Sequence, residues 1–330
     1  GHSRKLGMGR NIYGRKAVSF FRRAIFTQIL RRLAFFFIIP AFLSVPLGAE
    51  SAPSAENKTA SYKQLGFSGV DSPRVVQLRE KYQTTQYKWL FGILDNAEPY
   101  RIYVRNEIEK RGLPPILEYL PVVESNYIPT AKSKSGATGM WQFMLNSVKP
   151  FLHCDDYVDE RLDLWKSTQA ALSKLKENYD VFGDWLLAIT AYNCGAGAMQ
   201  RAVKKAGSRD FWYLSENGFL SAQAAGYVPK LLAVADAVEN ADYYGIPFPS
   251  ARDSAGKTID MRAGEFDYIT VKKSVSVRAL ARELRIDEDE LIRLNLALVQ
   301  GCTPPHKEYE IRLPEGMKAS AEYALHNLND

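Results

Sequence analysis

At residues 116–125 the chain reads ILEYLPVVES, an apolar stretch that ends in a glutamate and a serine. If residues 113–125 form one helix, Leu117 and Leu120 lie on the same face as Glu124. A carboxyl group on such an apolar face is poorly solvated, which raises its pKa. The pattern therefore predicts that Glu124 keeps a proton near neutral pH and can act as a general acid.

Two neighbours of Glu124 qualify this prediction. Glu118 lies six residues earlier, on a different face, so it is not expected to pair with Glu124. Pro121 is expected to bend the helix near its end. An isolated glutamate at a helix end is most often solvated, so the general acid is favoured only in combination with the motifs that follow.

The first of these motifs reads GATGMWQF at residues 136–143. Its two glycines permit a tight backbone close to a ligand, and the Gln142 side chain offers both a donor and an acceptor. Trp141 and Phe143 supply flat apolar faces suited to a sugar ring. Taken alone, these two aromatic residues would more often belong to the core.

The second motif reads AYNCGAG at residues 191–197 and ends a strongly apolar helix. Tyr192 and Asn193 supply a hydroxyl and an amide that suit a substrate acetamido group or the orientation of Glu124. Taken alone, this run would be an ordinary helix end followed by glycine.

Together with YVPK at residues 227–230, these runs resemble the lytic transglycosylases of the lysozyme-like superfamily, most closely the membrane-bound murein transglycosylase D type. The resemblance covers about residues 87–244. It implies a mainly α, lysozyme-like domain that cleaves the β-1,4 bond between N-acetylmuramic acid and N-acetylglucosamine in peptidoglycan strands. The product is a 1,6-anhydro-muramoyl end, and no metal or organic cofactor is implied.

The resemblance also implies roles for individual residues. Glu124 is the catalytic acid and base, and the substrate acetamido group assists it. The residues implied to bind substrate are Ser125, Gly139, Met140, Gln142, Tyr192, Asn193, Gln223 and Tyr227. Residues 159–161, which read DER, look like the family's connecting segment and are interpreted as structural support.

One position departs from the family pattern. A glutamate usually stands four residues before the tyrosine of the YVPK run, and this chain has Gln223 there. The lost charge would weaken stabilisation of a developing cation, so activity is reduced or substrate preference altered. Two alternatives stay open: a hydrolytic muramidase of the same fold, and a non-catalytic peptidoglycan-binding scaffold protein.

The C-terminal part has a β-α-α-β pattern that resembles a divergent LysM module. We expect a strand at 266–271, helices at 277–284 and 288–294, and a strand at 309–313. The Gly-Asp-Thr-Leu segment common in such modules is replaced by KSVS at residues 273–276. This loop would normally help to contact the glycan.

The net positive charge of the chain comes from its beginning. Nine of the 43 basic residues precede residue 33 and the first acidic residue is Glu50, which leaves 34 basic against 37 acidic residues. The apolar run at 33–49 behind this basic block predicts a secretory signal or an inner-membrane anchor, and hence the periplasm or cell envelope. Because the rest of the chain is slightly acidic, a nucleic-acid partner is not expected.

The predicted organisation follows from these boundaries. It comprises a signal or anchor at 1–49, a flexible tether at 50–69, the catalytic domain at 70–245, a linker at 246–265, the LysM-like module at 266–316 and a tail at 317–330.

Ser167 or Thr168 is expected to cap a helix of the catalytic domain. Export permits a Cys154–Cys194 bridge, which the sequence cannot establish. Cys302 and His306 lack a second ligand pair, so no metal site is inferred. The sequence sets no oligomeric state.

Overall fold

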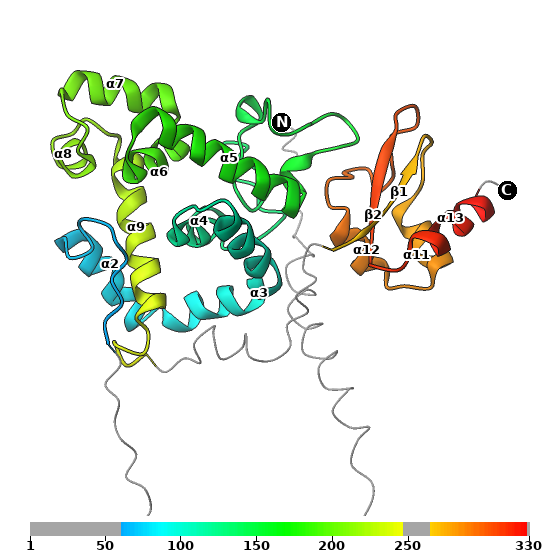
Figure 1. The fold of residues 1–330 in the computed structure, drawn as a ribbon, viewed down its shortest axis with the longest axis horizontal. Helices are drawn as coiled ribbons and strands as arrows, with labels where there is room; N and C mark the ends of the chain where they lie inside the picture. Colours follow the sequence, from blue (N-terminus) through cyan, green and yellow to red (C-terminus); the bar gives the residue numbers. More distant parts are fainter. Residues whose placement is uncertain (1–60, 247–264, 329–330) are drawn as a thin grey trace, which may run out of the picture. The chain divides into compact units, whose positions relative to one another are not determined.

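The computed structural model describes residues 61–246 and 265–328 (Figure 1). Lys58–Asp330 forms one compact unit of the chain. The first part of this unit is helical, as predicted. Its elements are α2 (Pro73–Gln83), α3 (Tyr87–Lys110), η1 (Pro115–Tyr119), α4 (Leu120–Ser125), η2 (Leu145–Ser147), η3 (Glu160–Leu162), α5 (Leu164–Phe182), α6 (Trp185–Cys194), α7 (Ala196–Ala206), α8 (Phe211–Glu216) and α9 (Ala222–Glu239).

The central element of the helical domain is α9. It contacts α2, α4, α6, α8 and η1, and most of its residues are buried, which fits its apolar character on all sides (Figure 1). The Ser221 side chain begins the helix by accepting a hydrogen bond from the backbone N–H of Ala224. Because α9 runs past both α4 and α6, it brings together motifs that lie about one hundred residues apart in the sequence.

The segment predicted as one helix at 113–125 is divided, which corrects that prediction. Pro115–Tyr119 forms the 3₁₀-helix η1, and α4 then begins at Leu120. Pro121 explains the break, because its ring would clash with the carbonyl four residues back in a continuous α-helix and it has no N–H to donate. Leu117 and Leu120 are nevertheless completely buried.

The predicted cap of α5 is also wrong. Asp163 caps this helix by accepting hydrogen bonds from the backbone N–H groups of Trp165 and Lys166. Ser167 and Thr168 lie inside the helix and are completely buried. Asp163 precedes them by a full turn and its carboxylate satisfies the free N–H groups, so the helix begins earlier than predicted.

The C-terminal module has the predicted β-α-α-β order. It consists of β1 (Asp267–Val271), α11 (Val277–Leu284), α12 (Glu288–Leu294) and β2 (Tyr309–Leu313). The strands pair antiparallel with Ile269 opposite Ile311, and both side chains enter the module's core. The predicted tail instead forms α13 (Lys318–Asn327), because Ala321 and Ala324 pack into the same core.

Two residues of the predicted tether bind α9 and its C-terminal end. The Tyr62 hydroxyl donates to Asp236, and the backbone N–H of Lys63 donates to the Asn240 side chain. Residues 1–60, with the predicted signal or anchor, and the linker residues 247–264 lie outside the described residues. Within the described part of the chain, no helix combines the length and apolarity needed to cross a membrane.

Candidate active site

Glu124 lies in the last turn of α4 and is half-buried. Burial raises the pKa of Glu124 from its ordinary value of 4.5 to about 7. The raised pKa makes Glu124 a carboxylic acid that still holds a proton near neutral pH.

The Tyr227 hydroxyl of α9 is a hydrogen-bond partner of the Glu124 carboxyl group. This hydroxyl donates a hydrogen bond to Glu124 Oε1. The bond favours the charged carboxylate and therefore opposes the effect of burial on the pKa of Glu124. Tyr227 is itself buried, and its own pKa is raised well above the ordinary value by desolvation. It therefore acts as a hydrogen-bond donor and holds the carboxyl group in one orientation.

The loop at residues 136–143 is anchored to α4 through Ser125. The Ser125 hydroxyl donates to the Met140 carbonyl at 2.7 Å, and Met140 itself is buried in the core. Gly139 has a φ of +86°, and an added Cβ would lie 1.9 Å from the Arg161 carbonyl oxygen. Only glycine fits there, because the backbone takes a left-handed conformation against another chain segment.

Trp141, the first of the two aromatic residues of this loop, belongs to the core, whereas Phe143 lines the cavity beside Glu124. Trp141 is completely buried and its indole N–H donates to the Thr168 hydroxyl at 2.9 Å. Its carbonyl accepts a hydrogen bond of 2.8 Å from the Tyr192 hydroxyl of α6. Tyr192 also packs edge-on against Phe143, with ring centroids 6.0 Å apart. The two predicted motifs are thus directly joined.

A cavity of about 370 Å³ opens beside Glu124. Four of the residues predicted to bind substrate line it together with Glu124: Gln142, Tyr192, Asn193 and Gln223. The other four lie outside the lining. Ser125 and Tyr227 hold the loop and the carboxyl group, Met140 is in the core, and Gly139 shapes the backbone.

Sequence patterns did not indicate several lining residues. These are Ser133, Ser135, Met144, Ser147 and Lys174. Lys174 is half-buried on α5, between the core residues Leu172 and Leu175 in the sequence. It belongs to no recognisable motif, so the sequence did not indicate it. Among the described residues that line the cavity, Lys174 is the only basic one and Glu124 the only acidic one.

A second cavity, of about 820 Å³, lies beside η1, α3 and the end of α9, away from Glu124. Three of the charged side chains that line it bind one another. Arg101 donates to Glu118 at 2.9 Å, and Arg105 also donates to Glu118 at 3.2 Å. Glu118 is therefore held by two arginines as a structural residue, separate from Glu124 as predicted.

The three cysteines are free thiols in this structure, so Cys154 and Cys194 are not bridged. In the described ranges, histidine, cysteine and carboxylate side chains form no group of three that could hold a metal ion.

Two regions of the chain match families of known proteins. Residues 103–215 match the transglycosylase SLT domain, and residues 265–330 match the LysM-like domain of the lytic transglycosylase MltD. The chain therefore contains a lysozyme-like SLT domain and an MltD-type LysM-like domain, which confirms the resemblance found in the sequence. Glu124, Gln142, Tyr192 and Asn193 lie within the matched SLT region, whereas Gln223 and Tyr227 follow it.

Two relatives carry names that describe an activity. Membrane-bound lytic murein transglycosylase D of Escherichia coli (strain K12) is 32% identical over 213 residues, which cover 63% of this chain and 46% of that protein. Peptidoglycan transglycosylase gp16 of Escherichia phage T7 is 36% identical over 124 residues, covering 36% of this chain and 9% of that protein. The match thus spans less than half the length of either relative.

Proposed function

We propose that the chain is a peptidoglycan lytic transglycosylase with Glu124 as its single catalytic acid and base. The observation that carries the proposal is the Glu124 carboxyl group, buried enough to raise its pKa to about 7 and directed by Tyr227 beside a polar cavity. A proton donor with a pKa near the working pH suits general acid catalysis. The names of the two relatives support the same activity.

In the first step, Glu124 protonates the oxygen that leaves the glycosidic bond, and the acetamido oxygen of the muramoyl residue attacks the anomeric carbon. In the second step, the substrate C6 hydroxyl attacks that carbon, and the bond to the acetamido oxygen breaks. The Glu124 carboxylate then accepts the hydroxyl proton. Water is not consumed, and the acid is regenerated.

A pKa of about 7 suits both steps, because the same group must lose a proton and then regain one. Gln142 and Asn193 line the cavity with amide groups that fit an acetamido group. Gln142 is held in place, since its side-chain amide donates to the Gly139 carbonyl at 2.8 Å.

Lys174 supports a substrate that carries negative charge. Peptidoglycan differs from uncharged polymers of N-acetylglucosamine by the carboxylates of its peptides, and Lys174 places a cation in the cavity. Lys174→Gln should therefore lower kcat/KM for strands whose peptides carry free carboxylates more than for strands whose peptide carboxylates are amidated. Equal losses on both substrates would contradict this role.

The membrane-bound relative and the predicted signal or anchor support a place in the cell envelope. The finer proposal is export to the periplasm, with or without attachment to the inner membrane. Fractionation of cells that express the full chain would test it, and recovery in the cytoplasmic fraction would refute it.

The activity is tested by mass spectrometry of the muropeptides released from purified sacculi. The chain should release anhydro-muramoyl products, and Glu124→Gln should release none while still binding sacculi. Glu177→Gln is a matched control, because Glu177 is an exposed glutamate on α5. Reducing ends in place of anhydro ends would identify a hydrolytic muramidase. Binding without release by the unmodified chain would favour the scaffold alternative.

A further inference from the structure

The LysM-like module is joined to the SLT domain by residues 153–163, here called the junction segment. The backbone N–H of Asp159 donates to the Ala297 carbonyl at 2.8 Å, and that of Val299 donates to the Tyr157 carbonyl at 3.0 Å. Val158 is 2% exposed and is part of the module's own apolar core. The two parts thus share backbone hydrogen bonds and a core residue, as interacting secondary-structure elements do.

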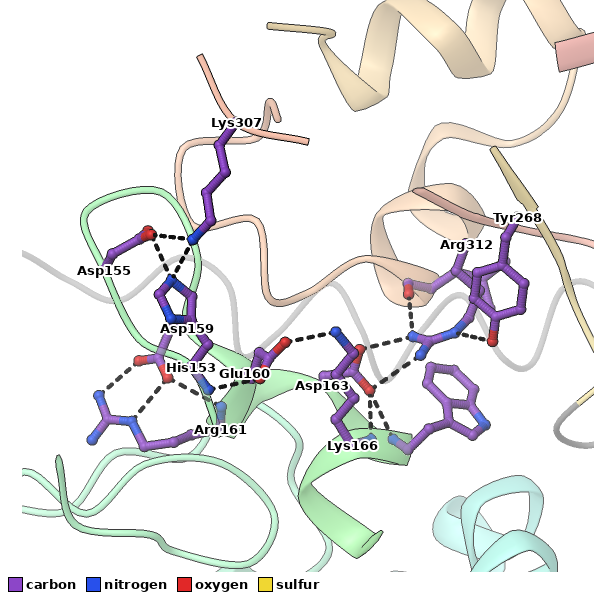
Figure 2. A network of polar contacts seen from close by, with 12 residues as sticks. His153, Asp155, Asp159, Glu160, Arg161, Asp163, Lys166, Tyr268, Lys307 and Arg312 are labelled. Carbon is purple, nitrogen blue, oxygen red and sulfur yellow. Dashed lines mark hydrogen bonds and ion pairs between the residues drawn. The ribbon is translucent and has the colours of Figure 1, made fainter. Parts of the chain in front are cut away.

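A buried ion pair reinforces this junction. Arg312 Nη1 on β2 lies 3.0 Å from Asp163 Oδ2, and both side chains are less than one-tenth exposed (Figure 2). The Arg312 guanidinium also lies over the Trp165 ring, 4.2 Å from its centroid. Phe266 packs edge-on against the same ring at 4.7 Å. A guanidinium removed from water in this way is held by its partners, because an unpaired buried charge would be costly.

The junction segment also supports the loop at residues 136–143, through Arg161. Its guanidinium binds the Asp159 carboxylate at 2.7 and 2.8 Å (Figure 2). The same guanidinium donates to the Gly136 carbonyl at 3.3 Å and to the Phe143 carbonyl at 3.4 Å. These two carbonyls stand at the two ends of the loop.

Asp159 is the link between the module and the active-site loop. Its backbone binds Ala297 in the module, and its side chain fixes Arg161, which holds the loop. The loop in turn carries Gln142 and Phe143, which line the cavity beside Glu124. An unbroken series of hydrogen bonds therefore runs from the module to the active site.

We propose that the LysM-like module is a structural part of the active site and that Arg312 is a positioning residue for catalysis. By binding Asp163 and the junction segment, the module keeps Arg161 against the carbonyls of the loop at 136–143. The proposal rests on the proposed function only for its kinetic readout.

The same contacts limit the module's freedom to act as an independent glycan-binding unit. The loop at residues 297–300 is occupied by the junction segment, since Gln300 also donates to the Asp156 carbonyl at 2.9 Å. The KSVS segment at residues 273–276 is bound by a residue that follows the loop at 297–300. Thr303, which is completely buried, donates to the Lys273 carbonyl and accepts from the Val275 N–H.

The test uses the full chain with Arg312→Met, which removes the charge and keeps most of the side-chain length. Arg282→Met is the matched control, because Arg282 lies in the same module, is 69% exposed and pairs with Glu288 within it. Steady-state kinetics on sacculi and backbone amide exchange are measured for each variant. Circular dichroism establishes that each variant is folded.

We expect Arg312→Met to lower kcat by at least about tenfold with KM changed by less than about twofold, since misplacement by about 1 Å can cost far more in rate. Amide exchange should become faster at 136–143 as well as in the junction segment. Arg312→Lys should recover part of the rate. Unchanged kcat together with unchanged exchange at 136–143 would overturn the proposal.

If Arg312→Met does not fold, Arg312→Lys and Gln300→Ala provide milder tests, because each weakens the junction without leaving Asp163 unpaired. Faster exchange at 136–143 in either variant supports the proposal, and exchange that changes only within the module refutes it. If the unmodified chain shows no turnover, the proposed function fails. The exchange measurements then still decide whether the module positions the loop.

Discussion

Ionisation of the Glu124 carboxyl group is expected to lower the free energy of unfolding of the chain. Its pKa in the folded chain is about 7, against 4.5 for an ordinary glutamate. At about 1.4 kcal/mol per pH unit, this difference corresponds to about 3 kcal/mol. Below about pH 4.5 the group is protonated in both the folded and the unfolded chain, so no cost arises.

As the pH rises from about 4.5 to about 7, the unfolded chain releases the Glu124 proton while the folded chain retains it. The free energy of unfolding therefore falls over this range, and the full cost of about 3 kcal/mol applies above it. Glu124→Gln has no charge to bury, and its amide oxygen can still accept a hydrogen bond from Tyr227. We expect this variant to be more stable than the unmodified chain by about 3 kcal/mol near pH 8 and by almost nothing near pH 4.

The measurement is urea-induced unfolding of both proteins at several pH values, followed by circular dichroism. Glu177→Gln makes the same chemical change at an exposed position and should show no pH-dependent difference. A stability gain for Glu124→Gln that is the same at low and high pH would refute the reasoning. So would a loss of stability near pH 8, since it would mean that the carboxylate stabilises the folded chain.

Three further substitutions test the site. Tyr227→Phe removes a donor that lowers the pKa of Glu124, so the basic limb of the kcat/KM profile should move to higher pH; a shift to lower pH would contradict this. Ser125→Ala leaves the Met140 carbonyl without its 2.7 Å bond and should lower the free energy of unfolding by about 1–3 kcal/mol, measured in urea. Gln223→Glu adds a like charge to the cavity and should also move the basic limb of the profile to higher pH; an unmoved limb would place this side chain away from Glu124.

The LysM-like module shows how much a local pattern determines. The predicted helix bounds at 277–284 and 288–294 and the strand at 309–313 agree with the structure. Each depends on nearby residues, for example Ser276 and Asp287, whose side chains cap the two helices. The prediction of a tail at 317–330 was wrong because α13 has little amphipathic character, so its sequence gives no clear local pattern. This helix is held instead by the burial of Ala321 and Ala324.

The site was predictable only where chemistry and spacing were both visible in the sequence. Glu124, Tyr192 and Asn193 stand in recognisable runs, and the structure brings them together. Lys174 stands in no motif, and Arg312 lies 149 residues from Asp163, so neither contact follows from a periodic pattern. Such pairs depend on the packing of whole elements, which a single sequence does not specify.

The departure at Gln223 bears on how Glu124 would perform both steps of the proposed mechanism. A glutamate at this place would add a second negative charge to the cavity and raise the pKa of Glu124 further. In this chain the pKa is raised by burial alone, with Tyr227 opposing it. After proton transfer, Glu124 is the only negatively charged side chain among the described residues that line the cavity. It must therefore balance the developing positive charge on the sugar and then accept the proton of the C6 hydroxyl. A group whose pKa lies close to neutral can be the acid in the first step and the base in the second. With Gln223 in place of a glutamate, the proposed mechanism still has its acid and its base, but Glu124 alone would supply the negative charge that stabilises the developing cation.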